Sequence, residues 1–205
     1  MDRTWIIDFD GTLIDVDLGR MFVSWMHSTR RIKKSGLVIR ALAWPLNELC
    51  RRCGYGQIVQ SWSTGLSVDA QMSAMHSFLD EECGSIVVNE HLLSILRLTE
   101  ARSKIVLTGC NQILVQAFLE TRGIRDFDAV IGLTTRGNIW VIQHPYSRSK
   151  VSIAKKYHPY VAVGDSWSDR HLLNQATESI VIDGDRRLRL LAEAKAWKVF
   201  PRVMA

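Results

Sequence analysis

The sequence has few of the residues that mark a disulfide-stapled or disordered chain. Its 205 residues include four cysteines and four prolines, and no stretch is of low complexity or rich in Pro and Ser, so long disordered segments are not expected. The N-terminus lacks the charged, apolar and small-residue regions of a signal peptide. We therefore expect reduced thiols and a cytoplasmic location.

Long apolar runs and base-stacking patterns are also missing. The most apolar run, residues 35–50, is interrupted by Arg40 and Asn47 and is shorter than the roughly 20 apolar residues that cross a bilayer. The net charge is +5, but aromatic residues do not alternate with the basic ones, so we expect no nucleic-acid partner. The basic segment 30–52 has two interpretations: a buried helix flanked by solvated charges, or an amphipathic helix on an anionic membrane.

Strands and helices alternate over most of the chain. Residues 4–8 are apolar and β-rich, residues 17–100 have helical periodicity, and strand and helix patterns alternate from residue 103 onward. This order predicts an α/β fold, with a Rossmann-like, mostly parallel sheet and a helical insertion after the first strand. We expect a core domain of residues 1–16 and 96–205 and a helical cap of residues 17–95.

Local patterns predict the individual elements. In the insertion, Phe22, Trp25 and Met26 share one helix face, Asp17 is a candidate cap for that helix, and Ser67 for a helix over 68–83. A hairpin arm is expected to turn at 136–138. The remaining expected strands are 104–108, 127–133, 160–165 and 179–183, and the remaining expected helices are 111–123, 149–157, 168–176 and 185–195.

Polar and charged residues stand where the predicted strands end or the following helices begin. Ligand sites of open parallel sheets form at these strand ends, so the side chains are expected to meet there. The candidates are Asp8 and Asp10 after the first strand, Thr108 and Gly109 after the second, Lys150 at a helix start, and Asp165 and Asp169 in the segment "GDSWSD".

This set of residue types suits phosphoryl chemistry. Four carboxylates in one pocket require cations, and Mg²⁺ takes oxygen ligands while leaving room for a phosphate group. A Lys ammonium and a Thr hydroxyl with backbone N–H groups can hold phosphate oxygens. A carboxylate at Asp8 can attack phosphorus, and Asp10 can exchange protons with the leaving group and with water.

The same residues resemble the four motifs of the haloacid-dehalogenase-like (HAD) hydrolase superfamily, in their usual order. They are "DFDGTL" (8–13), Thr108, Lys150 and "GDSWSD" (164–169). The resemblance implies that Asp8 is the nucleophile and Asp10 the general acid and base. It further implies that Mg²⁺ is held by Asp8, the Asp10 backbone carbonyl and Asp165, with support from Asp169. Thr108, Gly109 and Lys150 would bind the phosphoryl group.

The insertion resembles the cap of the phosphoserine-phosphatase-like subgroup, and segment 30–52 is similar to caps of phosphatidylglycerophosphatase-like members. Asp at both positions 8 and 10 favours phosphatases over dehalogenases. The resemblance thus implies a Mg²⁺-dependent phosphomonoesterase that forms an aspartyl-phosphate on a phosphorylated small metabolite. The alternatives are a phospholipid head-group phosphatase at the membrane surface, a phosphotransferase or mutase, and a non-catalytic membrane- or partner-binding module. The oligomeric state stays open.

Overall fold

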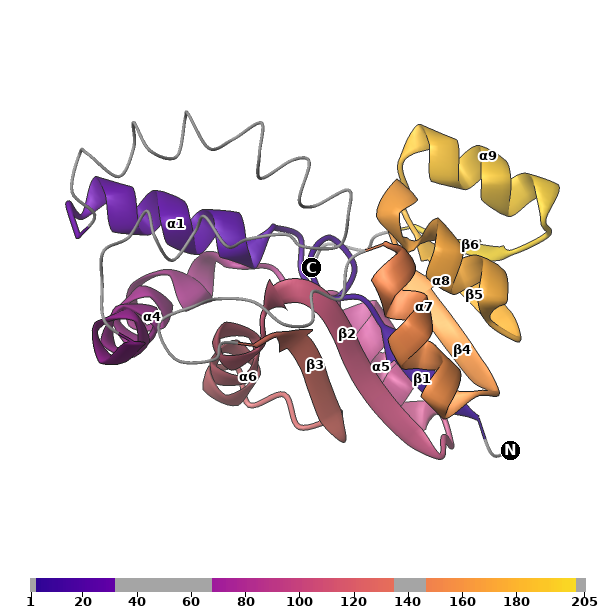
Figure 1. The fold of residues 1–205 in the computed structure, drawn as a ribbon, viewed down its shortest axis with the longest axis horizontal. Coiled ribbons are helices and arrows are strands. Elements are labelled where there is room, and N and C mark those ends of the chain that lie inside the picture. The colour runs from indigo at the N-terminus through magenta and orange to yellow at the C-terminus, as the bar shows by residue number, and fades with distance from the viewer. Residues whose placement is uncertain (1–2, 32–67, 135–146, 202–205) are drawn as a thin grey trace.

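The computed structural model describes residues 3–31, 68–134 and 147–201. Within these residues, six strands form one sheet in the order β3-β2-β1-β4-β5-β6 (Figure 1). Every neighbouring pair is parallel, which confirms the predicted α/β fold. The strands are β1 (Thr4–Ile7), β2 (Ser103–Asn111), β3 (Ala129–Leu133), β4 (Tyr160–Gly164), β5 (Glu178–Ile182) and β6 (Lys198–Phe200).

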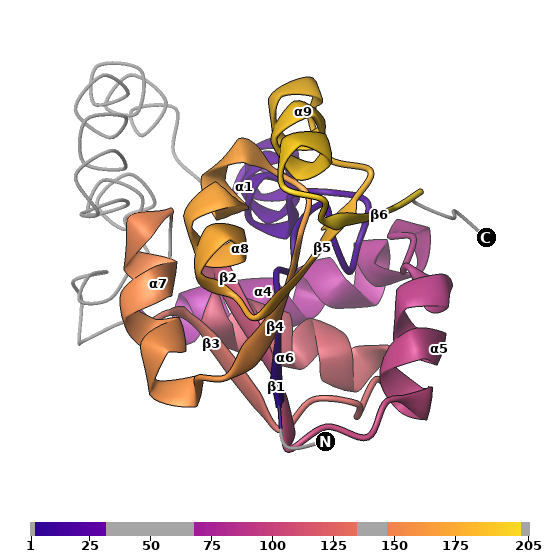
Figure 2. The same ribbon diagram turned by 90° about the vertical axis from the view of Figure 1, so that its right-hand side faces the viewer.

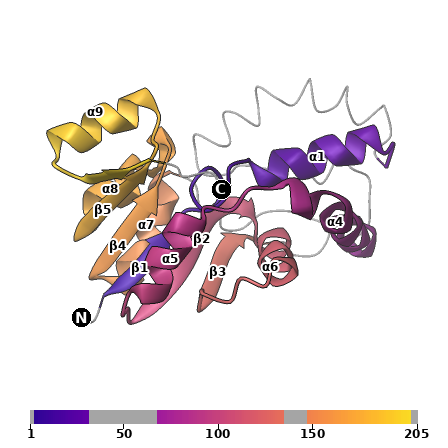
Figure 3. The ribbon, with the colours of Figure 1, turned by 180° about the vertical axis from the view of Figure 1, so that it is seen from behind.

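Helices cover both faces of the sheet and form a three-layered Rossmann-like core. Helices α5 and α6 lie on one face and α7 and α8 on the other (Figure 2); seen from behind, α5 lies across β1 and β2 (Figure 3). Helix α4 packs against both α1 and α6. The helices are α1 (Leu18–Ser28), α4 (Val68–Glu82), α5 (Glu90–Leu98), α6 (Gln112–Thr121), α7 (Arg148–Ala154), α8 (Arg170–Gln175) and α9 (Arg186–Ala194), and the 3-10 turns are η1 (Cys83–Ser85), η2 (Lys155–Tyr157) and η3 (Trp167–Asp169).

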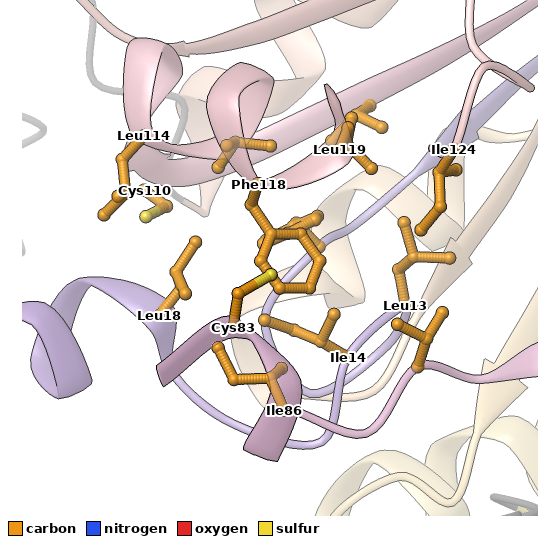
Figure 4. Packing of buried hydrophobic residues seen from close by; sticks show 14 of the residues in the cluster. Leu13, Ile14, Leu18, Cys83, Ile86, Cys110, Leu114, Phe118, Leu119 and Ile124 are labelled. Atoms are coloured by element: carbon orange, nitrogen blue, oxygen red, sulfur yellow. The ribbon is translucent and has the colours of Figure 1, made fainter. Parts of the chain in front are cut away.

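The alternation of side chains along the strands divides the core into two parts. Ile7 joins a buried cluster that α1, α4, α5 and α6 complete, whereas Ile6, its neighbour, joins a cluster with α7, α8 and α9, because successive strand residues point to opposite faces. Figure 4 shows part of the first cluster, in which Leu18 of α1 and Phe118 of α6 belong to one apolar core. Each such fully buried side chain contributes about 1.5–3 kcal/mol.

Most predicted elements are present, with shifts of a few residues at their ends. Asp17 caps α1, as expected, because its carboxylate accepts a hydrogen bond from the Arg20 N–H at 2.8 Å. The face with Phe22, Trp25 and Met26 is buried, also as expected. The sequence patterns did not predict β6, which has three residues and lies at the edge of the sheet.

Several predictions concern residues outside the described ranges. The hairpin turn at 136–138, the Ser67 cap and nearly all of the basic segment 30–52 are among them. The division into a core and a cap of residues 17–95 therefore stays a prediction. No helix in the described ranges has both the length and the apolar content that a bilayer crossing requires.

Candidate active site

The site lies where the order of the strands reverses. From β1 the chain proceeds to β2 and β3 on one side, and it then returns to place β4 on the other side of β1. Asp8 follows β1, and its N–H donates to the Val163 carbonyl of β4 at 2.9 Å. Asp165 directly follows β4. The two residues therefore lie at the carboxyl ends of adjacent strands, where open α/β sheets bind ligands.

Lys150 lies between two carboxylates. Its Nζ is 2.6 Å from Asp8 Oδ1 and 2.7 Å from Asp169 Oδ1. The Lys150 side chain is 3% exposed and that of Asp169 is fully buried. Lys150 comes from α7 and Asp169 from η3, which follows β4. The fold therefore brings the predicted phosphate-binding lysine into direct contact with the predicted nucleophile.

Asp165 completes an acidic group at this position. Carboxylate oxygens of Asp8, Asp165 and Asp169 all lie within 4.8 Å of one another. The Thr12 hydroxyl donates to Asp165 Oδ1 at 2.9 Å and so orients that carboxylate. Gly11 has φ +78°, and a Cβ at this residue would overlap the Asp165 carboxylate. Glycine is therefore required here both by its backbone conformation and by the close approach.

Charge in this group is unbalanced. Burial raises the pKa of Asp8 well above its ordinary value, and the Asp169 carboxylate adds to this, while the Lys150 ammonium acts in the opposite direction. Burial by itself would lower the pKa of Lys150, but Asp169 and Asp8 raise it, so the ammonium stays protonated. When Asp8, Asp165 and Asp169 are ionised, these three carboxylates and the Lys150 ammonium together carry a net charge of −2.

This donor set fits a divalent cation. Carboxylate oxygens are the ligands that Mg²⁺ prefers, and the net charge of −2 on these four groups is opposite in sign and equal in size to that of the ion. Asp8 and Asp165, at the ends of adjacent strands, are the residues that would hold the ion. Asp169 is engaged by Lys150 and by the Ser166 hydroxyl, which donates to its Oδ2 at 2.9 Å, so its place is in support of the site. The Asp10 carbonyl as a further ligand stays a prediction.

Asp10 lies in a different environment from Asp8. Its Oδ1 accepts a hydrogen bond from the Leu18 N–H at 2.8 Å, at the start of α1. The Thr108 hydroxyl is 3.4 Å from its Oδ2. Burial raises the pKa of Asp10 to about 7, and the Asp17 carboxylate adds to this shift. A carboxyl group with this pKa can both donate and accept a proton near neutral pH.

Thr108 and Gly109 lie in β2 where its pairing with β3 becomes irregular, between Leu107 and Asn111. Thr108 is fully buried, and its hydroxyl accepts a hydrogen bond from the Cys110 N–H at 3.0 Å. Asn111, three residues after Thr108, caps α6. Thr108 thus adjoins Asp10, and phosphate binding by Thr108 and Gly109 stays a prediction.

Sequence reasoning missed the residues that hold the acidic group in place. Ser166 bonds Asp169 through a capping box, for which the Ser-x-x-Asp spacing is a local signal that could have been used. Thr12 belongs to the first motif, but its contact with Asp165 spans 153 residues. Asn89 contacts the Thr12 carbonyl from 77 residues away. No local pattern predicts contacts of this kind.

Comparison with known proteins places this geometry in a family. The sequence matches the family described as haloacid dehalogenase-like hydrolase over residues 6–174. No sequence among the curated proteins matches the chain.

Solved structures with the same fold include a protein of unknown function from Bordetella pertussis Tohama I. It has a TM-score of 0.72 and 15% identity, over 98% of this chain and 99% of that one. A phosphoserine phosphatase in apo form has a TM-score of 0.56 and 16% identity, over 97% and 100% of the two chains. L-2-haloacid dehalogenase from Xanthobacter autotrophicus has a TM-score of 0.53 and 14% identity, over 96% and 83%.

At these identities the likeness to the solved structures is one of fold alone. The family match is a match of sequence, and the residues it covers include the end of β1, the whole of β4 and the loops that carry the acidic group. The chain therefore belongs to the haloacid dehalogenase-like hydrolase family.

Proposed function

We propose that this hydrolase is a Mg²⁺-dependent phosphomonoesterase that forms an aspartyl-phosphate on Asp8 and acts on a phosphorylated small metabolite. The observation that carries the proposal is the buried contact of Asp8 with Lys150, beside Asp165 and Asp169. A phosphate monoester is an anion, and a group of carboxylates can accept it when cations are present. Lys150 supplies one fixed positive charge next to the carboxylate that would attack.

In the first step, a carboxylate oxygen of Asp8 attacks phosphorus and forms a new O–P bond. The ester P–O bond breaks, and its electron pair stays on the leaving oxygen. Asp10, protonated, gives its proton to that oxygen, so the product leaves as an alcohol. Lys150 stabilises the negative charge on the phosphoryl oxygens beside Asp8 throughout this step.

In the second step, a water molecule attacks the phosphorus of the aspartyl-phosphate. Asp10, now ionised, takes a proton from this water, and the bond between phosphorus and the Asp8 oxygen breaks. Inorganic phosphate leaves, and Asp8 returns to the carboxylate form. The pKa of Asp10, raised by burial to about 7, suits a group that must both give and take a proton.

Asp8 and Asp165 are the residues that would hold Mg²⁺, with Asp169 in support. When bound, the ion supplies positive charge that neutralises phosphoryl oxygens. The protein itself orients the carboxylates: the Thr12 hydroxyl donates to Asp165, and the Ser166 hydroxyl donates to Asp169.

Asp10 supports a phosphatase in preference to a dehalogenase, although the family contains both. A halide leaves without a proton, whereas an alkoxide leaving group needs one. A carboxyl group two residues after the nucleophile, held by Leu18 and Thr108, has a use in phosphate ester hydrolysis that dehalogenation does not require. It would serve a phosphotransferase equally well, with a hydroxyl acceptor in place of water.

The expected contact of segment 30–52 with an anionic membrane stays a prediction, as does the cytoplasmic location. Almost all of this segment lies outside the described ranges. A phospholipid head group as substrate rests on the same segment, so the small metabolite is the substrate class that we propose.

Hydrolysis of p-nitrophenyl phosphate by the full chain, with and without Mg²⁺, tests the proposal. We expect Mg²⁺-dependent turnover that falls by more than about 10³-fold in Asp8→Asn, since the nucleophile is lost. Asp80→Asn, a change of the same chemistry at an exposed position of α4, should leave turnover unchanged. Turnover at the wild-type level in Asp8→Asn would contradict the assignment. Adding an alcohol acceptor and analysing the products distinguishes hydrolysis from transfer.

A further inference from the structure

The two chain segments that connect the sheet with the inserted helices are bonded to each other. Ile14, on the segment leaving β1, pairs with Val88, on the segment that leads into α5. The Asn89 N–H donates to the Leu13 carbonyl at 2.9 Å. Leu13, Ile14 and Ile86 also belong to one buried apolar cluster (Figure 4). The loop that follows the nucleophile is therefore held by residues from far along the chain.

The Asn89 side chain bonds at both of its ends. Its Oδ1 accepts a hydrogen bond from the Leu92 N–H at 3.0 Å and so caps α5. Its Nδ2 donates to the Thr12 carbonyl at 3.3 Å. Capping needs only an acceptor, which Ser or Asp would also provide. The second bond requires a donor at the other side of the same side chain, which the amide of Asn89 supplies, and it is made to the loop that carries Asp8 and Asp10.

Thr12 is also bonded to the acidic group, through its side chain. Thr12 is fully buried, and its hydroxyl donates to Asp165 Oδ1 at 2.9 Å. The Asn89 amide therefore fixes the peptide of the residue whose side chain orients Asp165. Residues that hydrogen-bond to a metal-binding carboxylate, without contacting the metal themselves, commonly affect metal affinity.

We infer that Asn89 is a positioning residue for the Asp165 carboxylate, acting through Thr12. It contacts no reacting atom. Two hydrogen bonds in series connect the segment that returns from the inserted helices with the acidic group. The first joins Asn89 to Thr12, and the second joins Thr12 to Asp165. The inference rests on the proposed function in one respect, namely that Asp165 holds the divalent cation.

Mg²⁺ binding to the full chain, measured by calorimetric titration, tests this role without relying on turnover. Asn89→Ser keeps an acceptor for α5 but removes the amide, and we expect the Kd for Mg²⁺ to rise by about threefold or more, with the roughly 10- to 100-fold cost of losing a direct partner of a ligand as the upper bound. Asn111→Ser is the matched control, because Asn111 caps α6 in the same way; its Kd should stay within about twofold of wild type. If Asn89→Ser does not fold, Asn89→Asp, which keeps the size and the cap acceptor, takes its place.

A double-mutant cycle separates positioning from general loss of stability. Thr12→Val removes the hydroxyl that contacts Asp165, and it should also weaken Mg²⁺ binding. If Asn89 acts through Thr12, adding Asn89→Ser to Thr12→Val weakens binding no further. Three results would each overturn the inference. The first is that the two changes in Kd multiply in the double variant, and the second is that Asn89→Ser binds Mg²⁺ like wild type. The third is that Asn111→Ser loses as much affinity as Asn89→Ser.

The same titration distinguishes this inference from the proposed function. Wild-type protein that binds no Mg²⁺ would overturn both. Wild-type protein that binds Mg²⁺ and hydrolyses p-nitrophenyl phosphate, with Asn89→Ser unchanged in Kd, would overturn the role of Asn89 and leave the proposed function standing.

Discussion

The two ends of the parallel sheet carry the same kinds of charged residue, but one end has more basic than acidic side chains and the other has more acidic than basic ones. At the amino ends of the strands, Glu178 lies between two cations, with Arg3 at 3.1 Å and Lys198 at 2.5 Å. These side chains are 28%, 31% and 60% exposed. At the carboxyl ends, the buried Lys150 instead lies between two carboxylates, with a third nearby.

The difference indicates which end of the sheet has a role other than stability. The Lys198 hydrogen bond lowers the pKa of Glu178, as expected for a surface ion pair, which contributes little to folding. Burial and neighbouring carboxylates raise the pKa of Asp8, so the folded state opposes its ionisation. Buried ionised groups contribute poorly to stability, and groups with strongly shifted pKa values concentrate at functional sites.

Removal of the lysine at each end should give the largest contrast in stability. Lys150→Met leaves Asp8 and Asp169 buried without their cation, and we expect the free energy of unfolding to fall by about 3–5 kcal/mol. Lys198→Met removes a partner from an exposed pair and should cost less than about 1 kcal/mol. Urea denaturation of both variants without added divalent ions measures the difference. Equal losses would contradict the distinction between the two ends.

Mg²⁺ should stabilise the protein through the carboxyl end alone. At a free concentration 100 times the Kd, binding to the folded state adds about 2.7 kcal/mol to the free energy of unfolding. Asp165→Asn should abolish this increase, because it removes a ligand. Glu178→Gln, an equivalent change at the amino end, should retain it. Thermal unfolding with Mg²⁺ or EDTA reports both, and a Mg²⁺ response that survives in Asp165→Asn would place the ion elsewhere.

The response of stability to pH should have opposite signs at the two ends. Asp10 has an ordinary pKa of 3.8 that rises to about 7 in the folded chain. Between about pH 4 and pH 7 the folded state therefore holds more protons than the unfolded state, and its contribution to stability falls as pH rises. Glu178, with its lowered pKa, contributes stability that is present above its ordinary pKa of 4.5 and is lost as pH falls.

Urea denaturation in EDTA at a series of pH values measures these contributions as differences from wild type. The stability of Asp10→Asn relative to wild type should rise by at least about 1.4 kcal/mol from pH 4 to pH 7, the equivalent of one pKa unit. The difference for Glu178→Gln should change in the opposite direction below its ordinary pKa. A difference for Asp10→Asn that is constant across this range would contradict the buried environment of Asp10.

The sequence predicts the position of the site well, because the candidate site residues lie at the ends of predicted strands. Once alternating strands and helices indicate a parallel sheet, Asp8 and Asp165 must come to the same edge. Helix faces and the Asp17 cap were equally readable, since their signals are local. The strand β6 was not, because three residues give too short an alternation.

The arrangement within the site could not be predicted in the same way. The amide that contacts the Thr12 carbonyl comes from Asn89, and the hydroxyl that orients Asp165 comes from a residue 153 positions away. Asp10 is held partly by the Leu18 N–H, a backbone group that any residue but proline would supply. Such contacts depend on tertiary packing, which leaves no periodic trace in the sequence.

Trapping of the covalent intermediate tests the central claim, that Asp8 is the nucleophile, most directly. The full chain of the Asp10→Asn variant is mixed with p-nitrophenyl phosphate and Mg²⁺, quenched in acid, and digested for mass spectrometry. Nitrophenolate leaves without a proton from Asp10, whereas the attacking water needs that base, so the aspartyl-phosphate should accumulate. The account predicts phosphate on Asp8. Phosphate on another residue, or none while wild type turns over the same substrate, would contradict it.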